Sequence, residues 1–171
     1  MSVEIEVSSR ILKTTLILAG MLILLVIGYI STPVVGGKAA LLTPQTREIV
    51  RYRRSAQEWI AILGNVDEQM GMVLDDDSGM DLLERVQAVS RAQMDVSGVL
   101  RGIDRTSVPV TMNTLNADIA ACAATHLDAV SAMEAWVNEP MSQRATQAKK
   151  ALQSANACVE KLRSNSLLQE E

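Results

Sequence analysis

An apolar stretch without a single charge, from Thr14 to Val35, constrains this chain more than any other feature of its sequence. A helix over these residues would be roughly 33 Å long at about 1.5 Å per residue, which matches a hydrocarbon core of about 30 Å. A helix can also satisfy all of its backbone hydrogen bonds inside lipid. We therefore expect a transmembrane signal anchor over 14–35, preceded by a short cytoplasmic N-terminus over 1–13.

The alternative for this stretch is a cleavable signal peptide. Arg10 and Lys13 form a basic flank before it, and Gly37 with Ala39 offers a small-residue cleavage site after it. A cleavable apolar region is usually about 7–15 residues long, which is shorter than this one. The sequence therefore favours an anchor that stays attached.

The basic residues near the anchor conflict with this topology. Lys and Arg are more numerous after the stretch than before it, which taken alone would place the rest of the chain in the cytoplasm. The residues after it are Lys38, Arg47, Arg51, Arg53 and Arg54. The four arginines fall inside a predicted helix, and large domains translocate largely regardless of such charges. We expect a single-pass protein of the cell membrane, with its C-terminal domain periplasmic or extracellular.

Beyond a linker over 36–43, apolar residues recur at spacings of three and four, which is typical of one face of a helix. Four such stripes run from Ile49 to Leu74, from Leu82 to Ile103, from Met112 to Val137 and from Met141 to Leu162. The short connections between them force consecutive helices to run antiparallel. The predicted fold class is all-α: the transmembrane helix is followed by an up-down-up-down antiparallel four-helix bundle over 44–165, with a tail over 166–171.

Turn and cap residues mark the ends of these stripes. Thr43-Pro44 suits the start of the first helix, because a hydroxyl can cap and proline fits the first helical position. Asp75–Gly79 breaks that helix, and Ser78 with Asp81 resembles a capping box that opens the second. Asn138–Pro140 forms the last turn.

The two cysteines fall at matching positions on the last two predicted helices. If these helices fold back about Pro140, Cys122 and Cys158 are equally far from the turn and lie opposite each other. We expect a disulfide between them, and such a bond persists in an oxidising compartment. The alternative is a pair of buried free thiols that pack as small apolar residues.

His126 is the sole histidine and lies one turn after Cys122 on the same face. Cys122, His126 and Cys158 could present three ligands to zinc or copper, but a disulfide would consume both thiolates. We therefore expect no metal or other cofactor. The sequence has no Cys-X-X-Cys-His motif to attach a haem and few aromatic residues to line a haem pocket. We expect His126 at the edge of the core, with one nitrogen hydrogen-bonded and the other near solvent.

Charge and composition bear on the partners. The net charge is −4 and aromatic residues make up 2% of the chain, so neither a basic face nor a stacking platform is available for nucleic acid. Arg47, Arg51 and Arg54 recur on one helical face near the anchor and could touch anionic lipid headgroups. The alternative is a solvated face paired in part with Glu48 and Glu58.

No motif in the sequence names a reaction, and we expect no enzyme. The favoured function is a structural or interaction module, an accessory subunit of a membrane complex whose partners are other membrane-protein subunits. One alternative is a ligand-sensing bundle, similar in architecture to the periplasmic sensor domains of chemoreceptors. Another is a carrier of a metal ion or haem.

Overall fold

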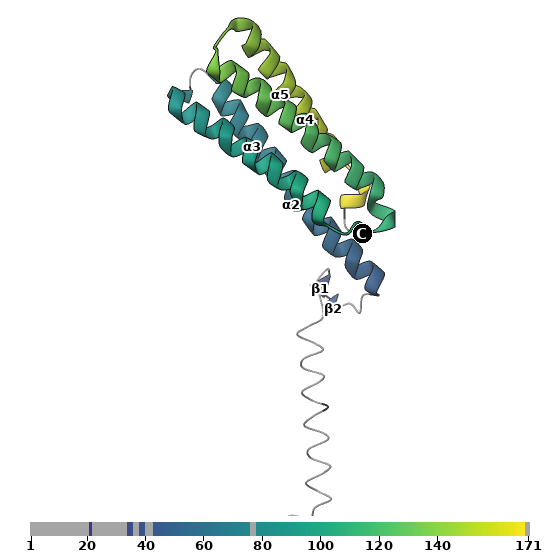
Figure 1. Ribbon diagram of the computed structural model, residues 1–171. Coiled ribbons are helices and arrows are strands. Elements are labelled where there is room, and N and C mark those ends of the chain that lie inside the picture. The colour runs from purple at the N-terminus through teal and green to yellow at the C-terminus, as the bar shows by residue number, and fades with distance from the viewer. Residues whose placement is uncertain (1–20, 22–33, 36–37, 40–42, 76–77, 170–171) are drawn as a thin grey trace, which may run out of the picture. The chain divides into compact units, whose positions relative to one another are not determined.

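The computed structural model describes residues 21, 34–35, 38–39, 43–75 and 78–169 (Figure 1). The chain divides into two compact units, Met1–Pro44 and Gln45–Glu171. The predicted N-terminus over 1–13 and nearly all of the predicted anchor over 14–35 lie outside the described residues. Within the described ranges, no helix combines the length and the apolar character that crossing a bilayer requires.

Two short strands lie in the first unit. β1 (Val34–Val35) pairs antiparallel with β2 (Lys38–Ala39), and Val34 lies opposite Ala39. The sequence between them is Gly-Gly, a pair that two-residue hairpin turns prefer. The predicted helical anchor over 14–35 includes Val34 and Val35, which instead form a strand directly after Pro33.

The second unit contains four long helices: α2 (Pro44–Leu74), α3 (Leu82–Arg105), α4 (Asn113–Asn138) and α5 (Ser142–Arg163). Consecutive helices are joined at alternating ends and lie side by side (Figure 1). A short 3-10 helix, η2 (Val110–Met112), leads into α4. The four-helix bundle predicted from the apolar stripes is thereby confirmed, with helix ends close to the predicted ones.

The start of α3 differs from the prediction. The cap is Asp81, whose Oδ1 accepts from the Glu84 backbone N–H at 2.8 Å, while the Glu84 carboxylate accepts from the Asp81 N–H at 3.0 Å. The predicted capping box of Ser78 with Asp81 is wrong, because Ser78 precedes a turn at Gly79, whose φ is +69°. A positive φ suits glycine, and the turn leaves Asp81 as the residue that enters the helix.

The core of the bundle is aliphatic, with few aromatic rings. α4 and α5 form the closest pair of long helices. Ala123, Ala148 and Ala155 are fully buried, and such small side chains let two helices approach closely. The larger buried residues, which fill the space between α2 and the other helices, include Tyr52, Leu63, Met70, Leu115, Ile119 and Met133.

The chain after α5 closes one end of the bundle. The 3-10 helix η3 (Ser166–Leu168) buries Leu168 in the core. Its backbone carbonyls are held by α2: Arg53 Nε donates to the oxygen of Leu167 at 2.8 Å, and Gln57 Nε2 donates to the oxygen of Leu168 at 3.1 Å. The packed unit therefore extends past the boundary expected at residue 165.

Candidate functional site

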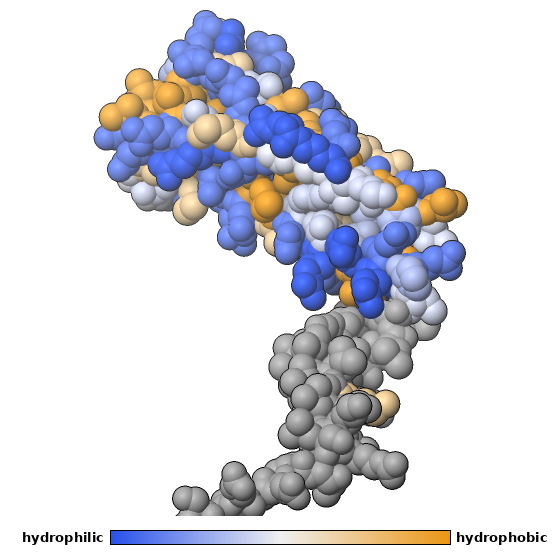
Figure 2. Space-filling model, turned by 60° about the horizontal axis from the view of Figure 1, so that its bottom comes forward, coloured by the Kyte–Doolittle hydropathy of each residue, from blue (hydrophilic) through white to orange (hydrophobic). Residues whose placement is uncertain are grey.

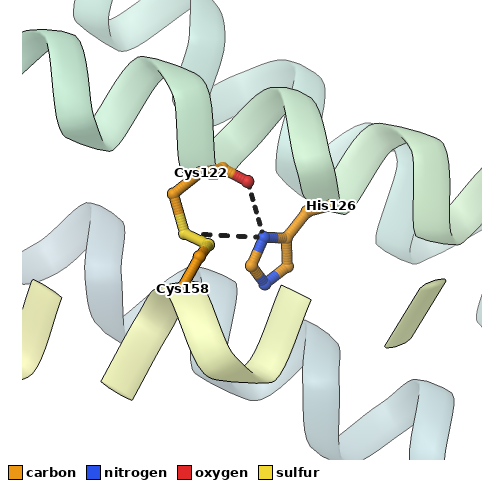
Figure 3. A group of neighbouring side chains, drawn as sticks. All are labelled: Cys122, His126 and Cys158. Atoms are coloured by element: carbon orange, nitrogen blue, oxygen red, sulfur yellow. Dashed lines mark hydrogen bonds between the residues drawn. A yellow bond between two sulfur atoms is a disulfide. The ribbon is translucent and has the colours of Figure 1, made fainter. Parts of the chain in front are cut away.

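Cys122 on α4 and Cys158 on α5 face each other across the closest helix pair and form a disulfide (Figure 3). Their Cα atoms are 5.7 Å apart, a separation that suits such a bond. The position of both residues relative to Pro140 predicted this juxtaposition, and it is confirmed. Cys122 is buried and Cys158 is half-buried, so one sulfur lies closer to solvent than the other.

His126 lies one turn after Cys122 on α4 and is only 1% exposed. Its Nδ1 is 2.8 Å from the carbonyl oxygen of Cys122 (Figure 3). A carbonyl oxygen can only accept, so Nδ1 carries a hydrogen and donates it. The same nitrogen lies 3.9 Å from the Cys122 sulfur. The expectation that the other ring nitrogen is near solvent is wrong, because the ring points into the bundle.

That second nitrogen faces Asp67, a residue of α2 that is 5% exposed. His126 Nε2 lies 3.2 Å from Asp67 Oδ1. Within the described residues, neither this nitrogen nor either carboxylate oxygen makes an aligned hydrogen bond. The contact is an ion pair when both ring nitrogens carry a hydrogen. A buried carboxylate is expensive unless a partner compensates it, so Asp67 depends on His126 for that compensation.

Sequence reasoning did not identify Asp67. The residue falls between Leu63 and Met70 at spacings of four and three, so it lies on the buried face of the first stripe. A charged residue at such a position is almost never fully buried unless it is paired. Its place in the stripe was the available signal, and the sole histidine was the natural candidate for its partner.

A cavity of about 480 Å³ opens beside the disulfide. Both cysteines line it, together with Asp118 and Thr125 from α4 and Lys161 from α5. His126 is not among the lining residues, so the ring lies behind the sulfurs as seen from the cavity. The cavity gives small polar molecules and ions a route to the disulfide.

The three arginines proposed to meet lipid headgroups are Arg47, Arg51 and Arg54. All three are exposed on α2, in its first three turns. The helix therefore presents them together to its surroundings, as the spacing predicted. Their contact with lipid stays a prediction.

A second surface lies at the end of the bundle where α3 and α5 begin. Here Leu82 and Leu83 are 65% and 64% exposed, and Val86 and Met141 are exposed as well. We call these four residues the apolar tip. Figure 2 shows one group of apolar side chains at an end of the bundle and smaller ones elsewhere on the same face. Two hollows of about 210 Å³ each adjoin the tip, and Leu82 lines one and Val86 the other.

One side of the tip is braced by α4. The Arg85 guanidinium lies 5.5 Å from the centre of the Trp136 ring, within the range of a cation–π contact. Trp136 is 8% exposed and lines the same hollow as Leu82. Arg85 and Trp136 therefore form one wall of the hollow that Leu82 also lines.

Comparison of the chain with protein-family models, curated proteins and solved structures gives no match.

Proposed function

We propose that this chain is a membrane-anchored, non-catalytic interaction module that acts as an accessory subunit of a membrane complex. The observation that carries the proposal is the apolar tip. Large apolar side chains that cluster on a surface commonly mark protein–protein contact sites. Four of them stand together where α3 and α5 begin.

The chemistry around the tip indicates the kind of partner. Asp81 and Glu84 are exposed beside Leu82 and Leu83, so carboxylates flank the apolar residues. Interfaces commonly combine an apolar centre with a polar rim, and complementary charges at the rim set the choice of partner. The expected partner is another subunit of a membrane complex, with an apolar patch flanked by Lys or Arg.

The disulfide supports the proposed compartment and the proposed role. A disulfide within the bundle favours the periplasm or the cell exterior over the cytosol. It also ties α4 to α5, the two helices on either side of the turn that carries Met141. A surface held rigid before binding loses less conformational entropy when a partner docks.

Co-isolation from a mild detergent tests this proposal. We expect the full chain to bring down a stoichiometric membrane protein. The double variant Leu82→Ser/Leu83→Ser should lose it, because each buried leucine contributes about 1.5–3 kcal/mol. Val110→Ser is the matched control: Val110 is also an exposed apolar residue, at 85%, but it lies at the opposite end of the bundle.

The control variant should retain the partner in full. Circular dichroism of both variants checks that the bundle is intact. A chain that is always isolated alone, or a partner that both variants retain, would contradict the proposal.

A further inference from the structure

We propose that reduction of the Cys122–Cys158 disulfide converts this position into a binding site for a thiolate-preferring divalent cation of the zinc class, with His126 as third ligand and Asp67 as the residue that orients His126. This inference concerns the reduced protein and is independent of the apolar tip. It rests on the geometry of four side chains from three helices.

The first observation is the distance between the potential ligand atoms. One ligand atom each from Cys122, Cys158 and His126 lies within 4.8 Å of the other two. Ligand atoms around a tetrahedral zinc ion are about 3.5–3.8 Å apart, given bonds of about 2.3 Å to sulfur and about 2.0–2.1 Å to nitrogen. Reduction lets the two sulfurs separate to that distance, while the imidazole nitrogen needs to move by only about 1 Å.

The second observation is the carboxylate behind the histidine. A ligating histidine almost always donates its other ring N–H to a carboxylate, a carbonyl or water, which fixes its tautomer and raises its basicity. Asp67 Oδ1 lies 3.2 Å from His126 Nε2, and the carboxylate has no aligned hydrogen bond within the described residues. Asp67 is thus placed to accept an N–H from Nε2 while Nδ1 faces the Cys122 sulfur.

The third observation is access. The cavity of about 480 Å³ is lined by both cysteines and not by His126. A cation can enter through it, and a water can fill the fourth position of a tetrahedral ion from the same side. Structural zinc sites have four protein ligands, whereas sites with three protein ligands leave the fourth position open to water.

A thiol reductant donates two electrons and two protons to the disulfide, the sulfur–sulfur bond breaks, and the reductant becomes a disulfide itself. The dication then displaces the two thiol protons from Cys122 and Cys158. In the oxidised chain the ring hydrogen on Nδ1 is donated to the Cys122 carbonyl. For metal binding the ring gives up this hydrogen bond, the Nδ1 proton passes to solvent and Nε2 carries a proton facing Asp67, so that Nδ1 of the neutral tautomer binds the cation.

Titration of the full chain with Co²⁺ tests the proposal, because cobalt bound to thiolates gives charge-transfer bands in the near ultraviolet. After reduction and removal of metal with EDTA and then of EDTA itself, we expect bands that saturate at one Co²⁺ per chain and disappear when Zn²⁺ is added. The oxidised chain should give none. Bands of equal strength in the oxidised chain, or no bands in the reduced one, would overturn the inference.

Four variants separate a built site from adventitious binding. Cys158→Ser and His126→Gln should abolish the bands or weaken Zn²⁺ binding by at least 100-fold. Asp67→Asn should weaken it by roughly 10–100-fold, as for other residues that orient a ligand. Asp118 lines the cavity without belonging to the ligand set, so Asp118→Asn should bind Zn²⁺ as the unaltered chain does.

Stability provides a second readout if the reduced chain or a variant loses structure. Zn²⁺ should raise the melting temperature of the reduced chain, seen by circular dichroism, and leave that of the oxidised chain unchanged. A reduced chain that melts at the same temperature with and without Zn²⁺ would count against the site. Binding that survives in Cys122→Ser/Cys158→Ser would place the metal elsewhere.

Discussion

The Cys122–Cys158 crosslink should contribute a large share of the net stability of the bundle. It closes a loop with a sequence separation of 36 residues. On the chain-entropy model, a loop of this size lowers the entropy of the unfolded chain enough to stabilise the fold by about 4 kcal/mol at 25 °C. Net stabilities of domains are about 5–15 kcal/mol, so the reduced bundle should be markedly weaker.

Urea unfolding followed by circular dichroism measures this contribution. With a slope of about 2 kcal/mol per molar urea, the midpoint of the oxidised protein should lie roughly 2 M above that of the reduced protein. The melting temperature should differ by roughly 10–20 °C. EDTA is present throughout, so that no metal replaces the crosslink.

The double variant Cys122→Ala/Cys158→Ala is the control for the reductant. It should unfold near the midpoint of the reduced protein and should not respond to reduction. The slope of ΔG against urea should be smaller for the oxidised protein, since a crosslinked unfolded chain exposes less surface. Equal midpoints for the oxidised and reduced proteins would refute the argument.

Two other predictions concern α2 and α3. Gly98→Ala should stabilise the bundle by about 0.5–1 kcal/mol, because an added Cβ meets open space in a helix interior. Gly102→Ala should destabilise the bundle, because the added Cβ would lie 2.8 Å from the Trp59 indole nitrogen. Thermal melts of the two variants should therefore shift in opposite directions, and equal shifts would contradict the packing described. Burial raises the pKa of Tyr52 from 10.0 to about 12. The neutral Tyr52 side chain therefore contributes fully to the unfolding free energy below pH 10, and this contribution is lost as the pH rises through 12. Unfolding free energy should fall by up to about 2 kcal/mol over that range, and Tyr52→Phe, measured alongside, should show a smaller fall.

The apolar stripes predicted the helices well because burial of one face has the same period as the helix itself. The pairing of Cys122 with Cys158 was also predictable, since a tight turn at Pro140 fixes the register of two antiparallel helices. Both inferences use residues that are close in sequence or related by one turn. Local pattern and simple geometry were sufficient for them.

The contacts that sequence reasoning missed join α2 to segments far along the chain. Asp67 meets His126, and Arg53 and Gln57 hold the carbonyls of η3. Such contacts depend on how α2 is rotated about its own axis relative to helices that are distant from it in sequence. The lengths of the turns do not determine this rotation. Asp81 was misjudged for a different reason: the cap depended on the backbone turn at Gly79 and not on the spacing of Ser78 and Asp81 alone.

The length of α2 determines how far the apolar tip stands from the start of the bundle. This helix has 31 residues, which corresponds to about 46 Å from Pro44 to the end where Leu82 and Leu83 lie. An even number of helices brings η3 back to the starting end. The helix length thus sets the distance between Pro44 and the apolar tip: removing two turns from every helix would shorten that distance by about 11 Å without altering a side chain of the tip.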